Sequence, residues 1–135
     1  GAMTCLLTCS DVEGGFDHSI VLKTGAEPLT GSTRLKAGTA TKLTLNIITT
    51  TLFTKLGKVY GNMMVDLRAT NNKLRDRAIR IVCNVCELDR DAAADLIEQS
   101  ESNVKLAIIM HTCNTDCASA KQQLEDAGGM LRTAL

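Results

Sequence analysis

The stretch from Pro28 to Ala40, Pro-Leu-Thr-Gly-Ser-Thr-Arg-Leu-Lys-Ala-Gly-Thr-Ala, constrains the fold of this chain more than any other. The short β-branched, apolar run at residues 19–22 precedes it and is typical of a buried strand. After it, apolar side chains recur at the spacing of one helix face, at Leu45, Ile48, Leu52 and Leu56. The stretch is therefore predicted to be a turn between a strand and a long helix over residues 33–56.

The residue types in this turn suit a helix start that faces an anion. Gly31 allows a tight turn or a close approach of a ligand to the backbone. A hydroxyl at Ser32 or Thr33 can accept a hydrogen bond from an N–H group of the first helical turn and so cap the helix. Because that first turn also carries unpaired N–H groups and the positive end of the helix dipole, it favours an anion.

Two cations, Arg34 and Lys36, stand where the helix dipole disfavours positive charge. A bound anion would remove this conflict. The alternative is that both side chains point to solvent or pair with a carboxylate such as Glu27. Gly38, inside the helix, costs about 1 kcal/mol relative to alanine, which indicates close backbone packing or ligand approach unless the glycine is merely tolerated.

Residues 27–43 closely resemble the signature of a known enzyme family, the N-acetylmuramic acid 6-phosphate etherases. These enzymes belong to the sugar isomerase (SIS) superfamily, and the glucokinase regulatory proteins carry a related segment. The likeness continues, in the order of the family, through residues 56–67, 69–74, 103–109 and 127–132. It covers nearly the whole chain and looks like only the C-terminal part of such an enzyme.

The resemblance implies that the parent protein is a lyase that cleaves the lactyl ether of N-acetylmuramic acid 6-phosphate to N-acetylglucosamine 6-phosphate and D-lactate. It also implies elimination followed by addition of water, with carboxylates as acid and base and with neither metal nor cofactor. In the family those glutamates come from the N-terminal half, so this chain alone is predicted to be inactive. Glu27, the one acidic residue in the signature, is the only catalytic candidate here.

Two other functions remain open from the sequence. The runner-up is a non-catalytic sugar-phosphate-sensing regulator that resembles the glucokinase regulatory proteins, which would share the phosphate-facing turn. The third is a free-standing interaction module, which would leave the turn without a ligand. Acidic residues at the family's catalytic positions, outside this stretch, would favour the lyase.

The predicted substrate-binding residues are those of the turn, namely Gly31, Ser32, Thr33, Arg34 and Lys36. We expect Lys36 and the two hydroxyls to contact the sugar 6-phosphate or the sugar beside it, because charge-assisted hydrogen bonds to phosphate are strong. Arg34 lies two positions from Lys36 and so points in another direction on a helix. We expect Arg34 to pair with a carboxylate that shapes the loop.

The chain is predicted to be a mostly helical α/β fragment. Residues 3–8 and 18–23 are expected to be the last strands of a SIS-type parallel sheet. Because two strands cannot bury both faces of such a sheet, its remainder must come from a missing N-terminal half or a second subunit, and a homodimer is expected. A second long helix is expected from a cap at Asn62 to about Glu87. Its middle carries a polar band that includes Asp66 and Asn71. Such a band is usually a solvated face, but the family resemblance makes it a possible site or subunit contact.

The predicted domain boundary follows that second helix. Residues 1–86 are assigned to the SIS sugar-phosphate-binding domain with its long helices. Residues 87–135 are assigned to a bundle of three short helices, similar to a ubiquitin-associated (UBA) domain but without its ubiquitin-binding loop. The expected caps of these helices are Asp89, Asn103, and Asp116 or Thr115.

Charge and hydropathy argue against two classes of partner. Fifteen basic and fifteen acidic residues cancel, and no basic stripe suits nucleic acid. The longest apolar runs fall well short of the roughly 20 residues of a membrane span. The six cysteines form three close pairs, but Cys83 and Cys86 lie in a helical run, so free thiols in a reducing cytoplasm are expected rather than zinc. His18 and His111 lack the spacing of a catalytic triad and are expected to be structural.

Overall fold

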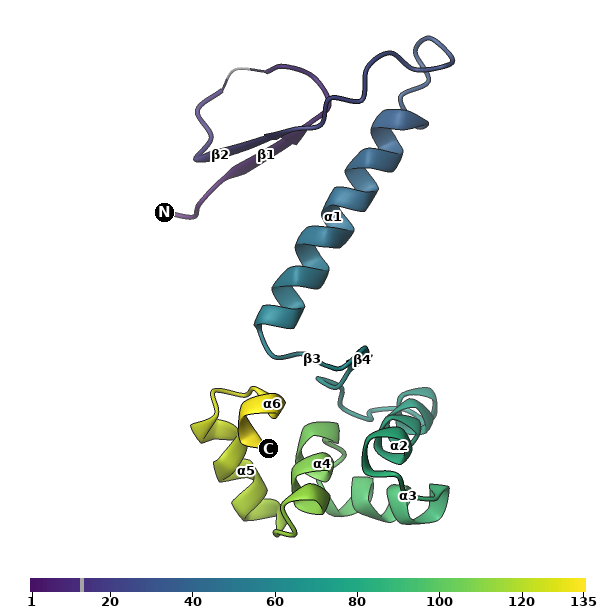
Figure 1. The fold of residues 1–135 in the computed structure, drawn as a ribbon, viewed down its shortest axis with the longest axis vertical. Helices are drawn as coiled ribbons and strands as arrows, with labels where there is room; N and C mark the ends of the chain where they lie inside the picture. The colour runs from purple at the N-terminus through teal and green to yellow at the C-terminus, as the bar shows by residue number, and fades with distance from the viewer. Residues whose placement is uncertain (13) are drawn as a thin grey trace. The chain divides into compact units, whose positions relative to one another are not determined.

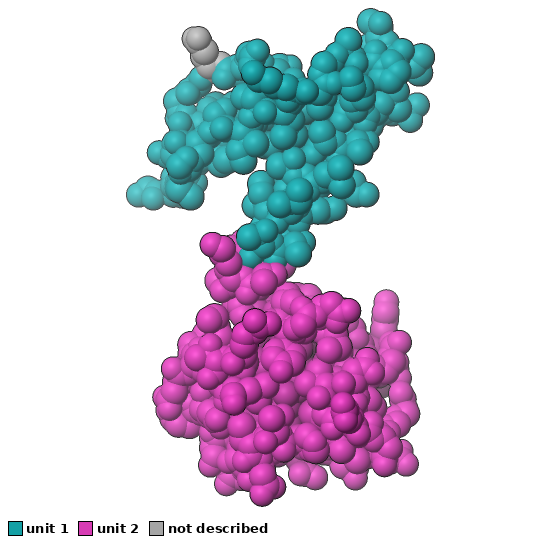
Figure 2. All heavy atoms as spheres, viewed as in Figure 1, with its two compact units in different colours: residues 1–51 teal, residues 52–135 magenta. Residues whose placement is uncertain are grey.

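The computed structural model describes residues 1–12 and 14–135. In this described part the chain forms six helices and four short strands, so it is a mostly helical α/β protein (Figure 1). It divides into two compact units, residues 1–51 and residues 52–135, which Figure 2 colours separately. The long helix α1 (Lys36–Lys55) contributes residues to both units.

Unit 1 begins with two parallel strands, β1 (Cys5–Thr8) and β2 (His18–Val21). Cys5 lies opposite His18 at the start of the pairing. The two predicted strands are therefore confirmed, with slightly shorter bounds. In β2 Ile20 is half-buried and the other three residues are exposed, because a sheet of two strands leaves both of its faces largely accessible to solvent.

Helix α1 confirms the long helix predicted after the turn, although it begins at Lys36 rather than Thr33. None of its 20 residues is buried. The predicted apolar stripe is present but uncovered, and Ile47 is 66% exposed. The other large exposed apolar residues of α1 are Leu43, Leu45, Ile48, Leu52 and Phe53.

A small hairpin follows α1 and overturns the helix expected from Asn62. Gly57 ends α1 with φ +67°, as expected of a glycine after a helix. The chain then forms β3 (Val59–Tyr60) and β4 (Met63–Met64), which pair antiparallel. Gly61 has φ +59° in the intervening turn, a conformation that glycine adopts without strain.

The second long helix, α2 (Asn72–Cys86), therefore starts nine residues later than predicted, since its cap is Asn71 rather than Asn62. Its cap is Asn71, whose side chain accepts a hydrogen bond from the amide of Leu74 at 2.9 Å. The segment before it is held by contacts distant in sequence, since Arg68 forms an isolated bridge with Asn103. The left-handed Glu87, with φ 54°, follows its last turn.

The three short helices that follow are confirmed together with their caps. Asp89, Asn103 and Asp116 each accept hydrogen bonds from first-turn amide groups, which satisfies donors that a helix start leaves unpaired. A final helical turn follows Gly128 and Gly129. The elements are α3 (Arg90–Gln99), α4 (Val104–Thr112), α5 (Cys117–Asp126) and α6 (Leu131–Ala134).

Helix α4 lies at the centre of unit 2 and packs against α2, α3, α5 and α6 (Figure 1). Its residues 104–109 are all buried, as expected of a helix that is apolar around its circumference. The remaining fully buried large side chains of the core come from the neighbouring elements, and they are Val65, Val82, Ile97 and Leu131.

Helix α2 belongs to this core. Ala78 and Val82 are fully buried, and α2 packs against α3 and α4. The apolar face of α2 therefore packs on the C-terminal helices, and the boundary between the compact units falls between residues 51 and 52. The division into domains between residues 86 and 87 remains a prediction.

Candidate functional site

The start of α1 is capped by a carboxylate from an earlier loop. The two oxygens of Glu27 accept hydrogen bonds from the amide groups of Lys36, at 2.8 Å, and Ala37, at 2.9 Å. These two bonds, that of Ala37 first, hold the pKa of Glu27 below its usual value. The prediction that Ser32 or Thr33 caps the helix is therefore wrong, since an ionised carboxylate is a stronger acceptor than a hydroxyl.

Lys36 turns back over the same loop. Its ammonium group donates to the carbonyl of Ala26 at 3.0 Å, and its charge also favours ionised Glu27. Glu27 thus supplies the negative charge at the start of α1. The alternative in which the side chains of Arg34 and Lys36 pair with a carboxylate such as Glu27 is not found as an ion pair among the described residues.

The other predicted binding residues lie on the turn itself. Gly31 has φ +81°, so the tight turn expected of a glycine is confirmed. Ser32 is half-buried, while Thr33 and Arg34 are exposed. Among the described residues, no carboxylate lies within ion-pair distance of the Arg34 guanidinium, so the pairing expected for it is not found there.

A groove of about 520 Å³ runs from this turn along α1. Its polar donors are hydroxyl, ammonium and amide groups. Gly38 borders it, and an added Cβ at this glycine would lie 3.3 Å from the carbonyl oxygen of Thr33. The close backbone packing predicted at Gly38 is therefore present. The groove is lined by Thr33, Ala37, Gly38, Thr41, Lys42, Leu45 and Asn46.

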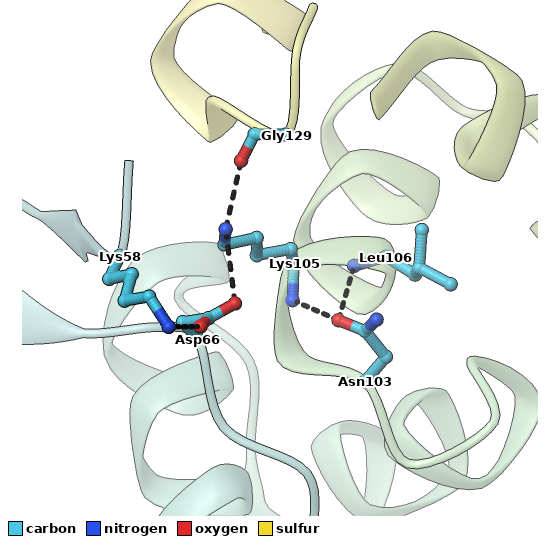
Figure 3. A network of polar contacts seen from close by, with 6 residues as sticks. All are labelled: Lys58, Asp66, Asn103, Lys105, Leu106 and Gly129. Atoms are coloured by element: carbon cyan, nitrogen blue, oxygen red, sulfur yellow. Dashed lines mark hydrogen bonds and ion pairs between the residues drawn. The ribbon is translucent and has the colours of Figure 1, made fainter. Parts of the chain in front are cut away.

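A second polar cluster lies inside unit 2 and centres on Lys105 (Figure 3). The Lys105 ammonium donates to the carbonyl of Gly129 at 2.8 Å and lies 3.3 Å from a carboxylate oxygen of Asp66. The other carboxylate oxygen of Asp66 lies 2.8 Å from the ammonium of Lys58. The side chain of Lys105 is only 8% exposed. The buried ammonium of Lys105, at the start of α4, therefore links that helix to the segment after the β3–β4 hairpin and to the turn before α6.

The Lys105 cluster explains the polar band predicted as a possible site. The hydrogen bond from Lys58 is the main cause of a lowered pKa at Asp66, with Lys105 adding to it. Asn71, in the same band, caps α2. Because two of the three ammonium protons of Lys105 face oxygen atoms of the chain itself, the cluster works as an internal cross-link.

The remaining reactive side chains are dispersed. Within residues 1–12 and 14–135 no three His, Cys, Asp or Glu side chains gather as a set that could hold a metal ion. All six cysteines are free thiols. His18 begins β2 and His111 lies in the last turn of α4. No described helix has the length and hydropathy needed to cross a membrane.

Sequence reasoning missed Lys105, although a signal for it existed. It is the one charged residue in the apolar run from Val104 to Met110 and directly follows the cap of Asn103. A charged residue in such a run must either reach solvent or be paired, since burying an unpaired charge is costly. Its partners could not be read from the sequence because they lie 39 and 24 positions away.

The chain is similar in sequence to proteins that share one name. The family described as the C-terminal lid domain of glucokinase regulatory protein matches residues 61–105. The chain is 49% identical over its full length to N-acetylmuramic acid 6-phosphate etherase of Gloeobacter violaceus, and covers 45% of that protein. The enzyme of that name from Staphylococcus epidermidis is 46% identical over 99% of the chain, and the chain covers 46% of its length. The enzyme of that name from Prochlorococcus marinus is 53% identical over 99% of the chain, and the chain covers 43% of its length. The chain thus spans less than half the length of these curated relatives.

Proposed function

Because the whole chain is related in sequence to the N-acetylmuramic acid 6-phosphate etherases, we propose that it is part of an enzyme that cleaves the lactyl ether of N-acetylmuramic acid 6-phosphate. The resemblance predicted from residues 27–43 is thereby confirmed, and the observation that carries the proposal is an identity of about half along the full chain. The products are N-acetylglucosamine 6-phosphate and D-lactate. The reaction is an elimination followed by addition of water.

The turn from Gly31 to Lys36, with the groove along α1, is proposed to contact the sugar phosphate. Support comes from the hydroxyls of Ser32 and Thr33 and from the exposed guanidinium of Arg34, which has no carboxylate partner among the described residues. The ammonium of Lys36 donates a hydrogen bond to the Ala26 carbonyl. Contact between Lys36 and the phosphate therefore requires that this hydrogen bond be exchanged, whereas Arg34 needs no such exchange.

Glu27 is proposed to shape the site rather than to act as the acid or base. Both of its oxygens already accept backbone hydrogen bonds, and its lowered pKa keeps it ionised. A general acid needs a proton at working pH, which a carboxyl with a lowered pKa does not hold. The acid and base are accordingly proposed to lie in the part of the parent protein outside this chain.

The finer architecture is proposed by analogy with the family. Strands β1 and β2 would be the last strands of a SIS-type parallel sheet, completed by an N-terminal half or a second subunit of a homodimer. The uncovered apolar face of α1, where Ile47 is 66% exposed, supports such a partner. The C-terminal helices, which the sequence predicts to be UBA-like, would pack against the sugar-phosphate domain or clasp the dimer. A cytoplasmic location suits six free thiols.

A second candidate function rests on the family match at residues 61–105. That family is described as the lid of glucokinase regulatory protein, so a sugar-phosphate-sensing regulator without catalysis would use the same turn. The etherase is favoured because the relatives of that name are similar to the whole chain rather than to 45 residues of it.

The test is release of D-lactate from N-acetylmuramic acid 6-phosphate by the full-length parent protein. The lyase proposal expects turnover by the parent and none by the 135-residue chain. Arg34→Gln, Lys36→Ala and Ser32→Ala in the parent are each expected to weaken substrate binding by roughly tenfold to a hundredfold, as for loss of one charge-assisted contact. Lys73→Ala, an exposed cation of unit 2, is the matched control.

The outcomes separate the proposals. A parent that binds the sugar phosphate without releasing D-lactate would establish the regulator instead. Turnover with affinities unchanged in all three turn variants would reduce the turn to a structural connection between β2 and α1. Sustained turnover by the isolated chain would refute the assignment of acid and base to the rest of the parent.

A further inference from the structure

A partly enclosed cavity of about 370 Å³ lies within unit 2, at the place where α1 ends and α6 begins. Its volume falls in the range of small-molecule sites, roughly 300–1,000 Å³. It contains none of the residues of the turn at 31–36, so it is separate from the site proposed above. It is lined by Thr54, Lys55, Gly57, Val59, Gly61, Met130, Leu131, Arg132 and Thr133.

The cavity carries positive charge without a compensating carboxylate. Lys55 comes from the last turn of α1 and Arg132 from α6, two segments far apart in the sequence. Among the described residues neither cation lies within ion-pair distance of an acidic group, and no acidic side chain lines the cavity. The negative end of the α1 helix dipole favours the positive charge of Lys55 in the last turn of that helix. The α1 dipole does not explain why Arg132, which belongs to α6, places a second positive charge at the same cavity.

The walls of the cavity are held by close contacts. An added Cβ at Gly57 would lie 2.9 Å from the Met130 side chain and 3.3 Å from the Gly129 carbonyl oxygen, so the backbone at the end of α1 touches the turn before α6. The hydrogen bond from Lys105 to the same Gly129 carbonyl fixes that turn from the other side. A cavity with fixed walls costs little ordering when a ligand enters.

We propose that this cavity binds a small phosphate monoester. The guanidinium of Arg132 and the ammonium of Lys55 match the two charges of such a phosphate, and the hydroxyl of Thr133 supplies a further donor. The apolar side chains of Val59, Met130 and Leu131 line the same cavity and suit a short carbon portion beside the charged group. A bare anion would leave most of this space and its apolar lining unused.

The test is a titration of the isotopically labelled 135-residue chain followed by its backbone amide resonances. The probes are glycerol 3-phosphate, inorganic phosphate, acetate and glycerol, each at constant ionic strength. Glycerol 3-phosphate is expected to give saturable shifts at Gly57, Gly61 and Arg132, with inorganic phosphate weaker and with acetate and glycerol giving no saturation. Shifts confined to other residues, or shifts that never saturate, would overturn the proposal.

Charge variants locate the site. Arg132→Gln and Lys55→Gln are each expected to weaken glycerol 3-phosphate binding by roughly tenfold or more, and Arg132→Lys by less. Arg77→Gln removes one exposed cation from α2 of the same unit and is expected to leave affinity unchanged. Both substituted cations are exposed, so the variants should fold, which thermal melting checks. Equal loss in Arg77→Gln would show a non-specific effect of net charge and refute the site.

Discussion

At the scale of single residues, Glu27 controls where α1 begins. Its carboxylate accepts the amide hydrogen bonds of Lys36 and Ala37, and its pKa is lowered in the folded chain. The stabilisation from a carboxyl of this kind is present above its unfolded pKa and disappears as pH falls through the lower folded pKa. The first turn of α1 should therefore loosen in acid.

We predict that Glu27→Ala will speed hydrogen exchange at the amides of Lys36 and Ala37 at neutral pH. Glu27→Gln should be intermediate because a carboxamide oxygen can accept a hydrogen bond but carries no charge. In the wild-type chain the same two amides should lose protection as pH falls below about 4.5, the ordinary pKa of this carboxyl. Unaltered exchange in both variants would show that the cap contributes nothing to the helix start.

Lys105 offers a second test at this scale. Lys105→Met keeps most of the length of the side chain but removes its hydrogen bond to Gly129 and its ion pair with Asp66. Because the Gly129 carbonyl then lacks its partner, the free energy of unfolding should fall by about 1–3 kcal/mol in urea titrations. The exposed Lys121, 3.8 Å from Glu101, is the control, and Lys121→Met should change stability by less than about 1 kcal/mol. Equal losses of stability in Lys105→Met and Lys121→Met would contradict the role of the Lys105 cluster as an internal cross-link.

At the scale of elements, the end of α1 depends on a glycine that touches the turn before α6. We predict that Gly57→Ala will destabilise the chain by about 1–2 kcal/mol for its left-handed backbone and by about 1–3 kcal/mol more for contact with Met130. Gly61→Ala is the matched control, because Gly61 also has a positive φ but no other atom within 4 Å of its added Cβ. The free energy of unfolding of each variant is measured by chemical denaturation. The difference between the two values measures the cost of the contact between the new Cβ at residue 57 and Met130, and a difference near zero would refute that contact.

Elements whose signals are local were predictable from the sequence. The caps Asp89, Asn103 and Asp116 stand directly before the apolar positions of their helices, and all three were found. A cap acts over two or three residues, so its pattern survives in the sequence.

The elements that were mispredicted depend on distant partners. Apolar spacing continues from Met64 through Leu67 to Leu74 and mimics a helix, although Met64 belongs to a β-hairpin. The segment between them is held by contacts about 40 residues away, such as the Asp66–Lys105 ion pair. Likewise the cap of α1 comes from Glu27, nine residues before Lys36, beyond the reach of local patterns.

At the scale of the whole molecule, the uncovered face of α1 predicts association. We expect the wild-type chain to self-associate at high concentration in light-scattering measurements, because a continuous apolar helix face is unusual on a soluble monomer. Ile48→Glu places a charge within the stripe that Ile48 forms with Leu45 and Leu52 and should shift the chain towards monomer. Thr50→Glu, at an exposed polar position on the opposite side of the same helix, should not. A well-folded wild-type monomer at every concentration would contradict this prediction.

The central place of α4 has a consequence for the synthesis of the protein. Leu131 and Ala134 are 1% and 4% exposed and close the core beside α4, so residues translated after α4 complete the packing of this central helix. A product released after residue 129 would carry the central helix with part of its cover missing. Such a truncated product should be a substrate for chaperones and proteases, because apolar side chains of its core would remain exposed.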